Sequence, residues 1–149
     1  TEQALGRIIG SLCVITTCQG ETHQGFLTSC ISQASLNPPG LMIAIPKKPE
    51  TEEYFDLESS FIVNILKEGR NVRRHFSAGN SSAFEALETE TAANGCLILT
   101  QALAYLECTV AQRVDAGDRW LVYALVNQGE VLEGTGLTAI SYRSSGRQI

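Results

Sequence analysis

The sequence lacks any hydrophobic run long enough to cross a membrane. No apolar stretch approaches the roughly 20 residues that a transmembrane helix needs. The first residues, Thr1–Ala4, also lack a basic segment, an apolar segment and an initiating Met, so they do not have the pattern of a secretory signal. We therefore expect no membrane association, and we expect the chain to be a module of a longer protein.

The sequence also lacks an excess of positive charge and has few metal ligands. Its 11 Lys and Arg against 16 Asp and Glu give a net charge of −5, the wrong sign for a surface that neutralises nucleic-acid phosphates. It has only 2 His, and no close group of His, Cys and carboxylates that could hold zinc or iron. These absences argue against a nucleic-acid partner and against a metal centre.

Cysteine pairs of the type Cys-x-x-Cys are missing as well. The 5 Cys are odd in number, and most lie inside apolar stretches where a thiol behaves as a small hydrophobic group. This pattern predicts free thiols, no disulfide and a cytoplasmic location, because the cytosol keeps thiols reduced.

The residues that are present predict one β-rich domain over residues 1–149. A hydrophobic share of 44% can supply a single core. Strands are expected at 11–17, 24–33, 41–45, 60–66, 97–100, 103–110, 120–126 and 137–143, and short helices at 1–10, after Pro49, at 67–76 and near 82–87. Because the strands follow one another as hairpins without a regular helix between them, we predict an antiparallel barrel with a few short helices.

One glycine motif matches a nucleotide-binding pattern by spacing alone. Residues 134–139 read G-x-G-x-x-A, as in a dinucleotide fingerprint. The motif needs a helix directly after its glycines and an acid about twenty residues later, and here the chain ends at Ile149. We interpret this segment as a turn between strands.

The segment 25–39 carries the denser signal. It places hydroxyl side chains at 28, 29, 32 and 35, ahead of a double proline at 38–39. Such an edge could bind a phosphate or a planar heterocycle, or it could be an ordinary strand whose hydroxyls bond to water and backbone. The composition of this segment leaves both interpretations open.

Several short segments of the sequence occur in the order and spacing of a known protein family. They are Ala4–Arg7, Cys13–Thr17, Gly25–Pro39, Phe61–Leu66 and Gly117–Asp118. Over nearly the whole chain this pattern resembles the flavin reductase-like family. More narrowly, residues 94–96, 104–108, 117–120 and 138–139, followed by Arg143, are similar to the C-terminal flavin reductase module of cyanobacterial diflavin flavodiiron proteins.

The resemblance implies an FMN-binding split β-barrel, usually a homodimer, with FAD as a possible alternative cofactor. It implies an oxidoreductase that uses NAD(P)H and passes electrons to flavodoxin-like and diiron modules of the parent protein. The cofactor contacts that it implies are a flavin strand at Leu27, Thr28, Ser29 and Cys30, Ser35 beside the ring, and phosphate contacts near Lys47 and Thr51.

Three departures from the family pattern leave a second hypothesis open. Cys30 stands where the family usually has Ser, and Arg119 stands where the family has the His of a Gly-Asp-His motif. The loop 46–49 is bracketed by prolines, so phosphate binding there would depend on charge alone. Arg119 could pair with the pyrophosphate or 2′-phosphate of a nicotinamide nucleotide. Alternatively, these changes leave a non-catalytic flavin-binding or dimerisation module.

Two further features are interpreted structurally. Trp120 alternates with Val122 and Ala124, which favours a core or dimer-interface aromatic over a flavin contact. The basic residues of 70–75 are interpreted as a solvated helix face.

Overall fold

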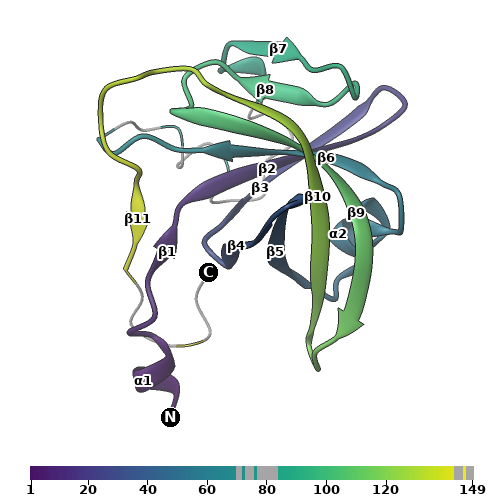
Figure 1. Ribbon diagram of the computed structural model, residues 1–149, viewed down its shortest axis with the longest axis vertical. Coiled ribbons are helices and arrows are strands. Elements are labelled where there is room, and N and C mark those ends of the chain that lie inside the picture. The colour runs from purple at the N-terminus through teal and green to yellow at the C-terminus, as the bar shows by residue number, and fades with distance from the viewer. Residues whose placement is uncertain (70–71, 73–75, 77–83, 143–145, 147–149) are drawn as a thin grey trace.

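The computed structural model describes residues 1–69, 72, 76, 84–142 and 146 (Figure 1). Its elements are α1 (Glu2–Leu5), β1 (Gly10–Ser11), β2 (Cys13–Gln19), β3 (Thr22–Thr28), β4 (Ile31–Leu36), β5 (Pro39–Pro46), α2 (Pro49–Glu52), the 3-10 helix η1 (Glu53–Phe55), β6 (Ser60–Ile65), β7 (Thr89–Thr91), β8 (Leu97–Leu99), β9 (Ala104–Asp115), β10 (Arg119–Val131) and β11 (Ile140–Ser141). Among the residues described, no helix is both long and apolar enough to cross a membrane.

Seven strands form one antiparallel sheet in the order β3-β2-β6-β9-β10-β5-β4. The two edge strands, β3 and β4, follow each other in the chain and are joined by Ser29 and Cys30 alone. The sheet must therefore curl until its edges converge at this connection, which we call the corner. A coiled sheet whose edges meet at one corner is a split barrel, so the predicted fold class is confirmed.

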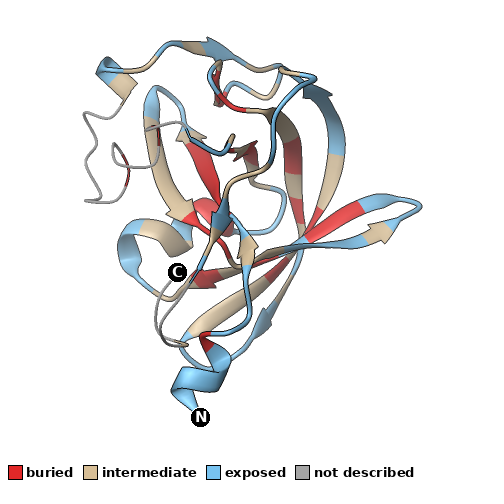
Figure 2. Cartoon of the chain, turned by 90° about the vertical axis from the view of Figure 1, so that its left-hand side faces the viewer, coloured by how far each residue is buried: buried red, intermediate tan, exposed pale blue. Residues whose placement is uncertain are grey.

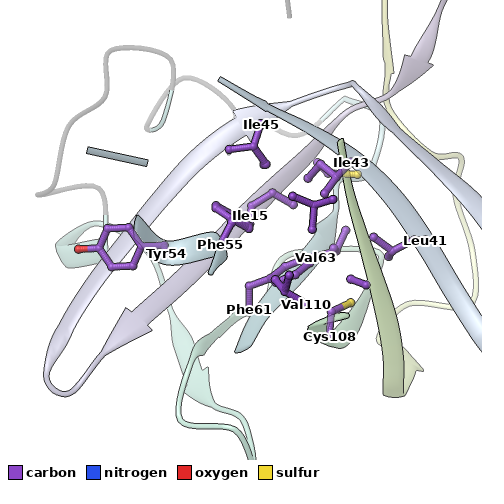
Figure 3. Packing of buried hydrophobic residues seen from close by; sticks show 13 residues of the cluster. Ile15, Leu41, Ile43, Ile45, Tyr54, Phe55, Phe61, Val63, Cys108 and Val110 are labelled. Carbon is purple, nitrogen blue, oxygen red and sulfur yellow. The ribbon is translucent and has the colours of Figure 1, made fainter. Parts of the chain in front are cut away.

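The core fills the inside of this barrel because one side chain in two along each strand points inward. Figure 3 shows Ile15, Ile43, Phe61 and Val63 meeting there from β2, β5 and β6, and all four are fully buried. Phe55 of η1 closes one end of the core, with its ring centroid 5.3 Å from that of Phe61. Because both faces of the central strands are covered, burial is continuous over Cys13–Thr17 and Phe61–Asn64, and Figure 2 shows such buried stretches in red within the strands.

The outer faces of the two halves of the barrel differ in how far other elements cover them. Over β2, β3 and β6, a second apolar cluster includes Val14, Leu66, Phe76 and Leu99, and a third joins Ile62 to the β7–β8 hairpin. Over β5 and β10, no described helix or strand outside their own sheet packs broadly. The described residues thus cover one half of the barrel on both sides and the other half only from inside.

The prediction of free thiols throughout was wrong. Cys18 of β2 and Cys96, which precedes β8, form a disulfide. Sequence spacing could not show this pair, because 78 positions separate the two residues and the fold brings their Cα atoms to 5.3 Å. Cys13, Cys30 and Cys108 are free, as expected.

Several predicted boundaries also need correction. The single strand expected at 24–33 is broken at the corner, and the double proline does not end the ladder, because Pro39 opens β5 opposite Leu36. The expected strand 137–143 shortens to β11, with Thr138 bridged to Lys67. The turn at 115–118 is confirmed, with Gly117 at φ 80°. Of the helix expected at 67–76, residues 67–69 form a bridge and a turn instead, and the basic residues Arg70, Arg73, Arg74 and His75 lie outside the described residues. Of the helix expected near 82–87, residues 84–85 have 3-10 geometry, and 82–83 lie outside the described residues.

Candidate functional site

The uncovered side of the barrel is an ordered surface of four residue rows across three strands. We call it the β4–β5–β10 face. Strand register sets its rows as Arg119–Pro46, Leu121–Ala44–Cys30, Tyr123–Met42–Ser32 and Leu125–Gly40–Ser35. Rows are spaced about 7 Å apart and neighbouring strands about 4.8 Å, so the face extends over about 20 Å along β5.

The middle rows of this face are apolar, which is unusual for a strand face directed away from the core. Antiparallel strands commonly bury one face and leave a polar face to water. Here Ala44, Leu121 and Tyr123 are half-buried, and Met42 is 42% exposed. With their inward neighbours also apolar, β5 and β10 have the composition of strands covered on both sides, and this predicts an occupant for the exposed face.

Hydroxyl groups close one end of the face. The Ser35 hydroxyl and the Tyr123 phenol lie 2.8 Å apart in a hydrogen bond that crosses β5 above Gly40. Only glycine fits there, because a Cβ on Gly40 would lie 2.5 Å from Ser35 Oγ and 2.6 Å from the Tyr123 ring. The close approach therefore fixes two polar groups at the edge of the apolar rows.

The corner between β3 and β4 is tightly packed. Thr28 and Ser29 are buried, and the backbone N–H of Cys30 donates to Thr28 Oγ1 at 3.1 Å. The Cys30 carbonyl accepts from the N–H of Ala44 at 3.0 Å, which sets the Cys30 side chain on the same face as Ala44. Leu27 instead packs into the second apolar cluster, on the covered half of the barrel.

A charged cluster surrounds Trp120 at the end of the barrel where β5 and β9 finish. The Trp120 ring lies 4.7 Å from Lys47 Nζ and 4.4 Å from Arg113 Cζ, and its N–H donates to Glu52 at 2.8 Å. Trp120 also packs against the core, so the core interpretation is confirmed. Lys47 Nζ is 2.5 Å from Asp115 Oδ1, and this hydrogen bond, with a second from the Gly117 N–H, holds the pKa of the Asp115 carboxyl below its usual value.

Thr51 lies beside this cluster, and its hydroxyl is within 3.2 Å of the carbonyls of Pro46 and Lys48. Both residues expected to contact phosphate, Lys47 and Thr51, thus already have protein partners. Arg119 lies on the opposite side of β10 from Trp120, at the end of the β4–β5–β10 face.

The other end of the barrel is open as an apolar cavity of about 400 Å³. Its lining includes Cys13, Val63, Leu106 and Val126, and Ser35 also lines it. Burial raises the pKa of the Cys13 thiol to about 12, so this group is neutral near pH 7. Of the residues predicted to contact the cofactor, only Ser35 borders this cavity.

The structure therefore brings together three of the eight predicted site residues on one face: Cys30, Ser35 and Arg119. Thr28 and Ser29 lie at its corner, and Lys47, Thr51 and Leu27 lie elsewhere. Our reasoning from the sequence did not select Met42, Ala44, Leu121 and Tyr123, although apolar residues at successive positions in both strands were a usable signal. Within the described residues, no group of three or more metal-ligating side chains occurs.

Comparison with known proteins agrees with this architecture. The flavin reductase like domain matches residues 5–148. The chain belongs to the flavin reductase-like family. It is 56% identical over 98% of its length to a protein of Nostoc sp. with the provisional name diflavin flavoprotein A 4, and 42% identical over 97% of its length to diflavin flavoprotein A 1 of Synechocystis sp.. In both cases it spans 26% of the relative's length, so these flavoproteins contain much more chain than this domain.

Solved structures show the same fold. A nitrilotriacetate monooxygenase component B homologue from Mycobacterium thermoresistibile superposes with a TM-score of 0.87 at 24% identity, over 95% of this chain and 80% of that one. An NADH:FAD oxidoreductase of Streptomyces globisporus, solved with NAD and FAD fragments, gives 0.84 at 22% identity, over 97% and 87%.

Proposed function

We propose that this domain is an NAD(P)H-dependent flavin reductase module that binds FMN on the β4–β5–β10 face. The observation that carries the proposal is an apolar surface with hydroxyls at one end and a cation at the other, left uncovered by the described residues. An isoalloxazine ring matches the middle rows because it is planar and largely apolar, with hydrogen-bonding groups along one edge.

The residues of the face would hold and orient the cofactor. Ala44 and Leu121 offer a low apolar surface for a flat ring, while the Ser35–Tyr123 pair offers hydroxyls to its polar edge. The Cys30 thiol is a weaker hydrogen-bonding group than the serine usual in the family. When bound, the flavin supplies the hydride chemistry, and the protein contributes orientation and electrostatics.

Three further parts of the proposal depend on relatives. The structural neighbour named as an NADH:FAD oxidoreductase was solved with NAD and FAD fragments, which supports a nicotinamide nucleotide as donor and keeps FAD as the alternative cofactor. Because the flavoprotein relatives are about four times longer than this chain, we infer that electrons pass to their other modules, flavodoxin-like and diiron in type. A homodimer would also cover part of the exposed apolar face.

The proposed compartment is the cytoplasm, as predicted from the odd number of cysteines, their apolar surroundings and the absence of Cys-x-x-Cys pairs. The Cys18–Cys96 disulfide is the observation that opposes a reducing environment.

A second candidate is a non-catalytic module in which a partner molecule fills the whole β4–β5–β10 face. The same exposed apolar rows favour it, because large apolar patches commonly mark protein interfaces. The two candidates differ in whether the face remains accessible to flavin in solution.

A substitution on the face separates these candidates. We expect the purified chain to quench FMN fluorescence at micromolar concentration and NADPH to bleach the bound flavin without oxygen. Ala44→Tyr should abolish quenching, because a large ring would stand on the apolar rows, whereas Ala4→Tyr, at an exposed position in α1, should not. Undiminished FMN binding by Ala44→Tyr would place the flavin elsewhere, and no uptake by the natural chain would favour the second candidate.

A further inference from the structure

The half-buried cations of this chain differ in whether a carboxylate neutralises them. In the part of the chain that the structure describes there are four: Lys47, Lys67, Arg113 and Arg119. Lys47 pairs with Asp115 at 2.5 Å, Arg113 with Asp56 at 3.3 Å, and Lys67 with Glu133. Among the described residues, Arg119 has no carboxylate within ion-pair distance. A half-buried guanidinium without a counter-ion is an open position for an anion.

The strand register fixes where this charge lies. Arg119 opens β10 opposite Pro46, and its carbonyl accepts from the N–H of Ala116 at 2.9 Å, which ties it to the β9–β10 turn. Alternation along β10 sets the Arg119 side chain on the same face as Leu121, one row or about 7 Å farther along. The nearest row of the apolar surface is thus within the reach of a short chain that joins a ring to a charged group.

The two acids near Arg119 in the chain, Asp115 and Asp118, form no ion pair with it. Asp115 is opposite Trp120 in the register, on the other side of the sheet, and its Oδ1 already accepts from Lys47 and from the Gly117 N–H. Asp118 precedes Arg119 in the exposed β9–β10 turn, and no ion pair joins these two residues.

Guanidinium chemistry specifies which anion suits this position. Arginine is always charged and presents a planar fork of N–H donors that matches the oxygens of a phosphate in a bidentate contact. A phosphate monoester carries close to two negative charges at neutral pH, which makes it a stronger partner than a diester.

We propose that Arg119 binds the phosphate monoester of the nucleotide that occupies the β4–β5–β10 face, an inference that rests on the function proposed above. Two sources have this chemistry: the 5′-phosphate of FMN and the 2′-phosphate of NADPH. The assignment adds Arg119 to the phosphate contacts expected at Lys47 and Thr51, where the Lys47 ammonium is paired with Asp115 and the Thr51 hydroxyl bonds to backbone carbonyls.

Two ligand pairs, each differing by one phosphate, test the proposal by binding alone. FMN is compared with riboflavin by fluorescence quenching, and NADP⁺ with NAD⁺ by calorimetry, on the natural chain and on Arg119→Ala. We expect the natural chain to bind the phosphorylated member of one pair about tenfold or more tightly, and Arg119→Ala to lose that preference. Arg119→Lys should retain part of it, since the charge remains without the fork.

The control is Arg113→Ala, which removes the same charge from the same end of the barrel but from a side chain already paired with Asp56. It should leave both preferences unchanged. The pair whose preference disappears in Arg119→Ala identifies the source of the phosphate.

The inference is overturned if neither pair shows a preference, or if Arg119→Ala keeps the preference of the natural chain. It is also overturned if Arg113→Ala lowers the preference as much as Arg119→Ala does, because nonspecific attraction by the positive charge at this end of the barrel would then explain the preference. Failure of the proposed function has a different signature, in which neither FMN nor riboflavin binds; the NADP⁺ and NAD⁺ pair then decides the inference alone.

Discussion

Reduction of the Cys18–Cys96 disulfide should lower the stability of this domain by a measurable amount. The bond closes a loop whose ends are 78 positions apart, and the chain-entropy treatment of a loop of this length gives about 4.5 kcal/mol. Noncovalent contacts of β8 would remain: Thr16 Oγ1 donates to the Leu97 carbonyl at 2.5 Å, and the Leu99 N–H donates to Asn64 Oδ1 at 2.9 Å. The loss should therefore arise mainly in the unfolded state.

The assay is thermal unfolding with and without a phosphine reductant. For a chain of 149 residues, this loss of stability corresponds to a decrease in Tm of about 14 °C on reduction. A double variant, Cys18→Ala with Cys96→Ala, should unfold at the same temperature under both conditions. An unchanged Tm of the natural chain on reduction, or five alkylated cysteines in the denatured unreduced protein, would refute the reasoning.

Three other perturbations are predicted from contacts described above. Gly40→Ala should weaken FMN binding several-fold in a fluorescence titration, because the added Cβ would displace the Ser35–Tyr123 hydroxyl pair above β5. Gly134→Ala, which has open space around it, should leave FMN binding unchanged. Equal effects of the two substitutions would show that the hydroxyl pair does not contribute to FMN binding. The lowered pKa of Asp115 means that its contribution to stability is present at neutral pH and is lost as pH falls through that lowered value. Urea unfolding should therefore show a slightly smaller acid-induced loss of stability for Asp115→Asn, and parallel pH profiles would contradict the assigned hydrogen bonds. Iodoacetamide at pH 8 should label Cys30 and spare Cys13, because the Cys13 thiol is buried and has a pKa of about 12. Bound FMN should slow the labelling of Cys30. Rapid labelling of Cys13 would show that the barrel opens in solution.

Local patterns in the sequence predicted the strands and the β9–β10 turn well. Apolar and β-branched runs at 13–17, 41–45 and 60–65 did form strands, because their side chains suit a pleated surface on both local and tertiary grounds. The boundaries failed where tertiary pairing overrode local signals. Pro39 can open β5 because the first residue of a strand need not donate to the ladder.

Site prediction was limited by a different cause. The segment 25–39 was predicted to bind the cofactor, but its residues divide between the barrel corner, the covered half and the exposed face. Leu27 and Cys30 are three positions apart in the chain, yet they belong to different surfaces because the corner separates them. Because β3 and β4 lie at opposite edges of the sheet, the inward and outward alternation of side chains cannot be continued from one strand into the next.

The sequence by itself determined that the fold is mainly β with enough apolar residues for a core, and its motifs indicated the family. Only the tertiary structure decided which charges are neutralised, which cysteines meet and which strand face stays uncovered. The physical reason is that these properties depend on pairs distant in sequence, such as Lys47 with Asp115 and Cys18 with Cys96. Their proximity results from the order in which strands join the sheet, and no local preference encodes that order.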